Sequence, residues 1–374
     1  MSIIDVEKKT DKVLAPIIFY PNLVVNKVKD KKIVCSPNSW KIMSPYLGYS
    51  MDESGRKITT DSKIKGKINH WMLTPCWDVD QPKREKFDAT IARGIIRACP
   101  GSFHLNPFSR MPAWIIGDAD SAEAIEFGKN WEAEYSNDLY NYILWLFRAF
   151  GARAVSITNG FEHSVRALWP CRDVRRLIGE ISKTVYYAVQ DARSENPNLK
   201  TKIIGFNDTI AGDSVNEVGK DHKWKKAFDE WFNAGGIEYC DEFGMHLYRW
   251  VGNKQDDWIE KYITIRDYLK STYGVEKIWI TETGYEAFIY KKVLCARGKR
   301  IDYLGRQAER WKNLLDFFRT ENSLAFIGAY NIWMPAPEFF DSRGQKVDAY
   351  GLLTPAFKPR PAFQHLRNFW IDNN

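Results

Sequence analysis

The stretch Ile278-Trp-Ile-Thr-Glu282-Thr-Gly-Tyr285 sets a carboxylate at the tip of an apolar, β-rich run. A run such as Lys277 to Thr281 is typical of a buried strand in a parallel sheet. A lone carboxylate is costly to bury, and Gly284 soon after it permits a sharp turn, so Glu282 is expected where a strand meets a cleft. The structural alternative is a strand-end Glu282 that pairs with a nearby Arg.

Working outward from this stretch, eight short apolar or β-branched runs alternate with longer amphipathic segments, as in a parallel sheet with helical crossovers. The predicted strands are Lys32–Ser36, His70–Thr74, Ser102–Leu105, Ala154–Thr158, Lys202–Gly205, Phe243–His246, Lys277–Thr281 and Phe326–Asn331. The predicted helices are Ser136–Phe150, Asp173–Arg193, Asp256–Tyr273 and Leu304–Thr320. This pattern predicts an α/β fold, the (β/α)8 TIM barrel.

The two ends of the chain fit this pattern less well. Residues 1–30 are polar around one apolar run, Ala15 to Tyr20, and are interpreted as an N-terminal extension that forms a hairpin or lid. Residues 31–374 are predicted to form one catalytic barrel with long βα loops, of which Asn38 to Ile68 is the longest irregular insertion. The tail from Pro355 to Trp370 is expected to supply the last helix.

The composition narrows the class of partner. The chain has 374 residues, of which 14% are aromatic, including 15 Trp. Most of these Trp are expected in the core, and several in a groove that stacks on flat ligands such as sugar rings or nucleobases. The net charge is +7, yet Lys and Arg are mixed with Asp and Glu and no nucleic-acid motif is present, so no nucleic-acid partner is expected.

The same sequence indicates whether a cofactor or a membrane is involved and in which compartment the protein acts. None of the six Cys forms a CxxC pair, and no Cys/His spacing is typical of a zinc site, so neither a metal nor another cofactor is expected. No run is long enough to span a membrane, and the N-terminus has no signal-peptide core. The chain is therefore interpreted as cytoplasmic, or extracellular after lysis or as part of a virion. The sequence leaves the oligomeric state open.

The residues at the C-terminal ends of the predicted strands are the candidate site, since barrels of this type carry their active sites there. They are rich in carboxylates, amides and aromatics, and include no Gly-rich phosphate cradle. The candidates, in chain order, are Trp77, Asn106, Trp114, Asn159, Glu162, Asn207, His246, Tyr248, Glu282 and Trp333.

These strand ends resemble the retaining glycoside hydrolases of clan A, which are (β/α)8 barrels. The Trp-Ile-Thr-Glu-Thr-Gly run is similar to the nucleophile strand of that clan, and His246-x-Tyr248 resembles its strand-six pattern. Ile332-Trp333 resembles the strand-eight Trp beneath the sugar. The segment from Asn106 to Trp114 is similar to the Asn/Ser-Pro…Pro-x-Trp segment of the xylosidase-like and exopolysaccharide-hydrolase-like branches.

The resemblance implies a role for each of these residues. Glu282 would be the nucleophile and Glu162 the acid/base of a double displacement on a polysaccharide or oligosaccharide. Tyr248 and His246 would keep Glu282 ionised by hydrogen bonding. The remaining candidates would bind substrate: Asn159 a hydroxyl beside the reacting carbon, Asn106 and Asn207 other polar groups, and Trp333 with Trp77 or Trp114 the sugar faces.

One departure from the clan keeps a second function open. The clan usually has Asn directly before the strand-four Glu, whereas here Gly160 and Phe161 separate Asn159 from Glu162. Either the loop bulges so that Glu162 still enters the cleft, or Glu162 is not the acid. The second case leads to the alternative function, a catalytically degenerate carbohydrate-binding barrel.

Several other candidates also have a purely structural interpretation. His246 is also compatible with a buried, hydrogen-bonded strand histidine, and Asn207 with an Asx-turn. Glu286 is a decoy for the nucleophile, since it follows the Gly turn. A third function, an aldolase or metal-dependent hydrolase, is disfavoured because no strand-end Lys or metal-ligand cluster is found.

Overall fold

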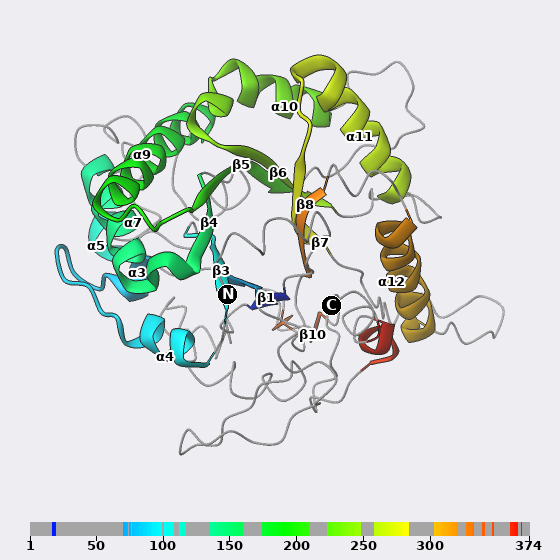
Figure 1. Cartoon of the computed structure of the whole chain (residues 1–374), viewed down its shortest axis with the longest axis horizontal. Coiled ribbons are helices and arrows are strands. Elements are labelled where there is room, and N and C mark those ends of the chain that lie inside the picture. The colour runs from blue at the N-terminus through cyan, green and yellow to red at the C-terminus, as the bar shows by residue number, and fades with distance from the viewer. Residues whose placement is uncertain are drawn as a thin grey trace. The chain divides into compact units, whose positions relative to one another are not determined.

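The computed structural model places eight parallel strands in chain order, β1 to β8, as in a (β/α)8 barrel (Figure 1). It describes residues 17–19, 70–73, 75, 77–98, 101–107, 112–116, 135–159, 174–209, 223–247, 258–283, 303–320, 327–332, 339–340, 346–347, 360–365 and 368. The chain divides into two compact units, one of residues 70–281 and one of residues 1–69 with 282–374. Each unit is described by itself.

The unit of residues 70–281 carries the strands β2 to β6. Each strand pairs in parallel with the next in the chain. The strand bounds are β2 (His70–Leu73), β3 (Ser102–Leu105), β4 (Ala154–Thr158), β5 (Lys202–Thr209) and β6 (Glu242–Leu247), and β7 (Ile278–Thr283) follows them. The observed bounds of β3 and β4 are the predicted ones, and the other four strands overlap their predictions.

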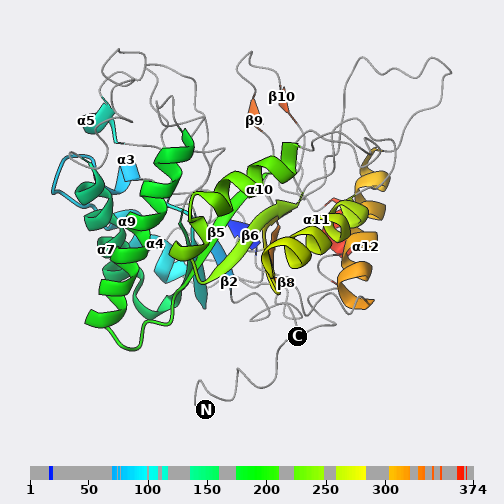
Figure 2. The same ribbon diagram turned by 90° about the horizontal axis from the view of Figure 1, so that it is seen from above.

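Helices lie outside these strands. Their bounds are α3 (Trp77–Asp80), α4 (Thr90–Ala98), α5 (Ala113–Ile116), α7 (Ser136–Phe150), α9 (Val174–Glu195), α10 (Lys223–Asn233) and α11 (Trp258–Tyr273), with the short 3-10 helices η1 (Gly151–Arg153) and η2 (Gly236–Tyr239). The predicted α7, α9 and α11 are confirmed to within two residues at each end. In two perpendicular views α7 and α9 lie side by side (Figures 1 and 2).

Helix α7 shows why the sequence folds as it does. Its apolar residues recur every three or four positions, which gives it one buried stripe; the stripe is Leu139, Tyr142, Ile143, Leu146, Phe147 and Phe150. Asp138 in its first turn receives two hydrogen bonds from Arg84, of 2.8 and 3.2 Å. A carboxylate there also suits the positive end of the helix dipole. The helix ends at Gly151, whose φ of 56° favours glycine.

The core of this unit is strongly aromatic where α10 covers β5 and β6. Phe206 of β5 stacks on Phe243 of β6 at 5.3 Å between ring centroids, and both contact Phe228 and Trp231 of α10. These four aromatic residues are therefore structural.

The unit of residues 1–69 and 282–374 contains β1 (Ile17–Phe19), which pairs in parallel with β8 (Ile327–Ile332). It also contains α12 (Tyr303–Thr320) and a small antiparallel pair, β9 (Phe339–Phe340) and β10 (Lys346–Val347). In α12, Trp311 and Leu314 are fully buried. Residues 361–365, within the predicted last helix, are helical.

The position of the first strand corrects a prediction. Residues 32–36, predicted as strand one, lie outside the described residues, and the strand that pairs with β8 is Ile17–Phe19 instead. The residues around the predicted boundary at residue 30 also lie outside the described residues, so that boundary stays a prediction.

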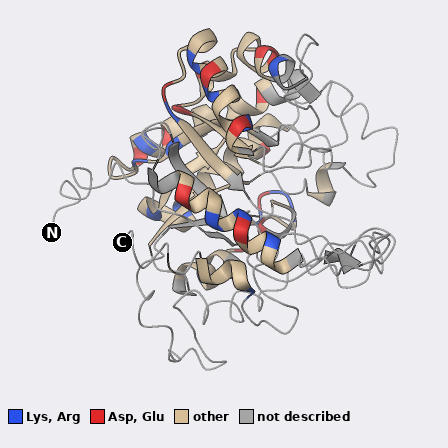
Figure 3. Ribbon diagram, turned by 90° about the vertical axis from the view of Figure 1, so that its right-hand side faces the viewer, with Lys and Arg blue, Asp and Glu red and all other residues tan. Residues whose placement is uncertain are grey.

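Charged residues of both signs are interspersed over the helices of the described part of the chain (Figure 3). No group of three or more potential metal ligands occurs among the described residues. Within that same part, no helix has the length and apolarity that a membrane crossing requires.

A tyrosine pair on α11 predicts how stability should respond to alkali. The hydroxyls of Tyr268 and Tyr273 both donate to Asp229 Oδ1 of α10, and the ring of Tyr273 stacks on Phe232. Burial, followed by the Asp229 hydrogen bond, raises the pKa of both phenols above the ordinary value of about 10. The folded state therefore holds these protons more tightly than the unfolded state.

The stabilisation from this pair is expected to be complete below about pH 10 and to be lost as the pH rises through the folded-state pKa values. Tyr273→Phe keeps the stacked ring and removes one of the two titrating protons. Its unfolding free energy, from urea titrations at pH 8 to 11 followed by circular dichroism, should fall less steeply with pH than that of the wild type. Equal slopes would contradict the role assigned to this hydroxyl.

Candidate active site

Four of the predicted site residues lie at the C-terminal ends of neighbouring strands in the unit of residues 70–281. Asn106 directly follows β3, Asn159 directly follows β4, Asn207 is near the end of β5, and His246 is near the end of β6. Since the strands are parallel and paired in this order, these ends meet at one edge of the sheet. All four residues are at most 3% exposed.

Asn106 is held in place by the strand beside it. Its Oδ1 accepts a hydrogen bond of 3.1 Å from Thr158 Oγ1 of β4, and its backbone N–H donates to the Leu73 carbonyl of β2. The residue is therefore held from both neighbouring strands, its side chain by β4 and its backbone by β2, and such support preorganises a side chain.

A second polar pair lies deeper along the same two strands. His104 Nδ1 and Ser156 Oγ are 2.8 Å apart, and the two residues are opposite each other in the β3–β4 register. Phe103, the residue before His104, contacts Phe150 of α7, so His104 faces the side of the sheet away from that helix. With Asn106 and Thr158 two residues further on, the inner side of β3 and β4 is polar.

The sequence reading did not single out His104, Ser156 or Thr158. The signal was nonetheless present, because polar residues recur with a period of two at positions 104 and 106 and again at 156 and 158. In a strand this period puts both residues of each pair on one face. Among buried strands, such polar alternation indicates a functional interior rather than an apolar core.

Asn207 is the residue that the structure distinguishes most clearly. It is completely buried, and neither atom of its amide group has a hydrogen-bond partner among the described residues. Its φ of 49° and that of Phe206, 63°, are in the left-handed region, at the point where the β5–β6 register shifts. Strain and an unpaired buried amide are costly, and they persist mainly at functional sites.

The same observation argues against the structural alternative for Asn207, an Asx-turn. In an Asx-turn the side-chain oxygen accepts a hydrogen bond from a backbone N–H two residues further on. Oδ1 of Asn207 accepts no hydrogen bond from the described residues. The amide therefore makes no hydrogen bond to the described residues, and the backbone geometry around it is set by the bulge.

Asn159 is only partly available. Its Nδ2 donates to the Tyr239 carbonyl of η2 at 2.8 Å, while its Oδ1 has no partner among the described residues. A contact with a sugar hydroxyl would thus use Oδ1 as an acceptor. The donor side of the amide ties β4 to the segment that leads into β6.

His246 is 2% exposed and is opposite Thr209 in the β5–β6 register. It shares its strand with Gly244, where an added Cβ would lie 2.5 Å from Ile204 Cγ2 and 3.0 Å from Thr281 Cγ2. The backbone of β6 therefore approaches its neighbours closely just before His246. This close packing restrains the backbone of β6 two residues before His246.

The two described tryptophans of the candidate set differ in position. Trp77 is 1% exposed, stacks on Tyr142 at 5.4 Å between ring centroids, and donates to Gln81 Oε1. Trp114 is half-buried, meets Trp77 edge to face, and donates to the Gln81 carbonyl. Trp77 is thus a core residue in this structure, so Trp114 is the better candidate for stacking on a sugar.

The remaining predicted residues are placed less fully. Glu282 is the penultimate residue of β7. Glu162, Tyr248 and Trp333 lie outside the described residues. Their roles stay predictions.

The chain is similar to known proteins in fold but not in sequence. No protein-family model matches the chain, and no curated protein is similar to it in sequence. Solved structures are similar in fold. Xylanase XynB from Paenibacillus barcinonensis, complexed with a conduramine derivative, has a TM-score of 0.53 and 14% identity, over 81% of this chain and 89% of that one.

Two further structures agree with this result. Xylanase 10B from Thermotoga maritima has a TM-score of 0.53 and 15% identity over 100% of both chains. A structure of a mutant in complex with xylotriose has a TM-score of 0.54 and 14% identity, over 82% of this chain and 90% of the other. At such identities the likeness concerns the fold, and the chain shares the (β/α)8 barrel of these xylanases.

Proposed function

We propose that this protein is a retaining glycoside hydrolase that cleaves a polysaccharide or oligosaccharide by double displacement. The observation that carries the proposal is the row of buried polar side chains at successive strand ends, with the unpaired amide of Asn207 among them. Glu282, the penultimate residue of β7, would supply the attacking carboxylate. The fold shared with xylanases supports the same conclusion.

The proposed chemistry follows from the leaving group. A glycosidic bond expels a poor alkoxide through an oxocarbenium-like state, so one carboxyl must attack the anomeric carbon and another must protonate the departing oxygen. Glu282 is assigned the attack and Glu162 the protonation. Glu162 would then remove a proton from the water that releases the sugar. This route needs the two carboxyls about 5–5.5 Å apart.

The described amides would bind the sugar that is being transferred. Asn207 can both donate and accept, Asn159 offers Oδ1, and Asn106 is fixed by Thr158. Hydrogen bonds that strengthen as charge develops on the sugar lower the barrier, whereas equal binding throughout does not. A buried imidazole at His246 adds a polar group near the end of the neighbouring strand.

Hydrolysis of a panel of aryl glycosides and polysaccharides tests the proposal, with xylan and xylotriose included because of the structural neighbours. At least one substrate should be cleaved with retention of anomeric configuration, as followed by proton NMR of the first product. Sugar binding without turnover anywhere in the panel would instead favour the catalytically degenerate carbohydrate-binding barrel.

Glu162→Gln tests whether Glu162 is the acid, because its effect on the rate should depend on how much the leaving group needs a proton. If Glu162 is the acid, the variant should lose on the order of 10²–10⁴-fold in rate on a polysaccharide, which needs protonation of its leaving oxygen. Cleavage of a dinitrophenyl glycoside, whose leaving group needs no proton, should fall far less in its first step. An equal loss on both substrates, or none on either, would remove Glu162 from this role.

A further inference from the structure

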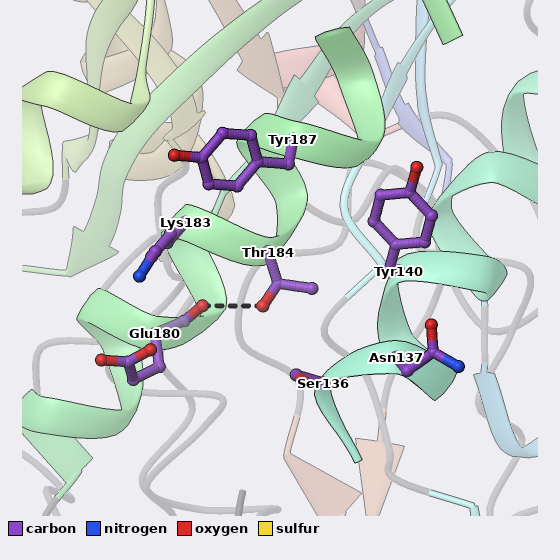
Figure 4. A pocket seen from close by; sticks show the side chains of 7 residues that line it. All are labelled: Ser136, Asn137, Tyr140, Glu180, Lys183, Thr184 and Tyr187. Atoms are coloured by element: carbon purple, nitrogen blue, oxygen red, sulfur yellow. Dashed lines mark hydrogen bonds between the residues drawn. The ribbon is translucent and has the colours of Figure 1, made fainter. Parts of the chain in front are cut away.

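A shallow groove separates the outer faces of α7 and α9, away from the candidate active site. It has a volume of about 300 Å³, near the lower end for ligand sites. Figure 4 shows that both helices contribute side chains to it. We refer to it as the α7–α9 groove, formed by Ser136, Asn137 and Tyr140 of α7 and by Glu180, Lys183 and Tyr187 of α9.

An exposed aromatic ring is its most unusual feature. Tyr187 is 49% exposed, the largest value among the exposed large hydrophobic residues of the described chain. Its ring is braced by an edge-to-face contact with Tyr186, at 5.6 Å between centroids, and Tyr186 in turn meets Tyr239 in the same way. The ring is therefore held in position, and little rotamer entropy remains to be lost when a ligand stacks on it.

The second aromatic ring is fixed by a different contact. The Tyr140 hydroxyl donates to Asp191 of α9, and this hydrogen bond is the main reason that the pKa of Tyr140 rises to about 12. The phenol therefore remains protonated, and its oxygen can still accept a hydrogen bond. Thr184 Oγ1, which donates to the Glu180 carbonyl, is likewise left with acceptor capacity.

The groove has few charges, and they do not favour an anion. Lys183 and Glu180 contribute one charge of each sign, and Asp191 beside Tyr140 adds a negative charge. Asn137 and Ser136 add uncharged donors and acceptors at the start of α7. A groove with no excess of positive charge, an aromatic face and many mixed polar groups suits a neutral polyhydroxylated ligand better than an anion.

The helices also determine where the groove lies. In a βα unit the helix begins on the side where the preceding strand ends. Ser136 is the first residue of α7, and the α9 residues of the groove begin at Glu180, in its second turn. The groove therefore lies on the outer wall, beside the first two turns of α7 and the middle of α9.

We propose that the α7–α9 groove is a second binding site for a neutral polysaccharide chain, with Tyr187 as its stacking platform. The inference rests on the proposed function, because a polymer held in a catalytic cleft supplies the chain that the groove would bind. The groove would raise the local concentration of polymer substrate without touching the bond that is cleaved.

Affinity electrophoresis in gels that contain neutral arabinoxylan, mixed-linkage glucan or galactomannan tests this proposal. All variants carry Glu282→Gln, so that the polymer is not degraded. Tyr187→Ala should weaken retardation in at least one gel about fivefold or more, whereas Tyr187→Phe keeps the ring and should bind as the parent does. Ile237→Ala is the matched control, since Ile237 is 42% exposed but lies outside the groove.

The outcomes distinguish this proposal from the proposed function. Equal retardation of Tyr187→Ala and its parent in every gel would contradict the proposed binding site. Retardation only in an additional gel that contains anionic polygalacturonate would contradict it as well. Turnover of a short aryl glycoside, too small to reach from cleft to groove, is measured separately in proteins with Glu282 intact. Absence of that turnover together with loss of gel binding in Tyr187→Ala would support the groove and contradict the hydrolase.

Discussion

Replacing Glu282 by Gln is expected to lower the hydrolysis rate on the order of 10⁴-fold or more, as removal of a covalent nucleophile does in other enzymes. Gln has nearly the shape of Glu, so the loss would reflect the missing negative charge and lone pair rather than a cavity. Glu282 is the penultimate residue of β7, and the strand before it is buried at Ile278 and Ile280. The backbone that carries Glu282 is thus well anchored.

Chemical rescue distinguishes a nucleophile from other essential carboxylates. Glu282→Gly leaves space for a small anion, and azide should then attack the anomeric carbon from the side that Glu282 occupied. The aryl leaving group departs with its bonding electrons, and the product is a glycosyl azide of inverted configuration. Its appearance by mass spectrometry and NMR, together with a rate that rises with azide concentration, is the expected result.

Glu286 provides the control, since it lies four residues further along the same segment. Glu286→Gln should retain activity close to that of the wild type. If Glu286→Gln were inactive and Glu282→Gln active, the nucleophile would be Glu286, and the identification of the strand-seven motif would be wrong.

Gly205→Ala is expected to be strongly destabilising, by about 1–3 kcal/mol of unfolding free energy. An added Cβ would lie 2.6 Å from Trp231 Cζ2 and 2.7 Å from Cys240 Sγ. Trp231 cannot easily yield, because it is packed among Phe206, Phe232 and Phe243. Midpoints of thermal unfolding, compared with those of the wild type, measure the effect.

A double-mutant cycle identifies the cause of the loss. Trp231→Phe removes the ring carbons that the new methyl group would strike, so the double variant should be less destabilised than the sum of the two single variants. Gly94→Ala in α4 is the matched control, since nothing lies within 4 Å of its added Cβ. It should be neutral, or stabilise by about 0.5–1 kcal/mol because Ala favours a helix. Additive effects in the cycle would rule out the clash.

The fold was predictable wherever a segment carries its own pattern. The bounds of β3, β4 and α7 follow from local periodicity, which needs no knowledge of distant partners. Strand β5 runs four residues beyond its prediction, to Thr209, because the left-handed pair Phe206–Asn207 absorbs a register shift that the sequence does not display. Helix α10 was not predicted, since its aromatic residues alternate closely with charged ones.

The candidate site was predictable as a set of strand ends, but not as a set of contacts. That Asn159 donates to Tyr239, 80 positions further along, depends on a pairing that only the folded chain brings about. Trp77 illustrates a different limit, because core tryptophans and sugar-stacking tryptophans have the same sequence surroundings. Only its burial against Tyr142 separates the two roles.

The pairing of Ile17 with Ile332 has a consequence for how the protein is synthesised. A ribosome makes β1 before β2 to β7 and its partner β8 after them, whereas β2 to β6 are made consecutively and each pairs with the next strand. Until β8 is made, the edge of β1 that pairs with β8 is open, and an open strand edge can pair with another chain and lead to aggregation. Because β1 has only three residues, its open edge offers few backbone groups to another chain before β8 is made.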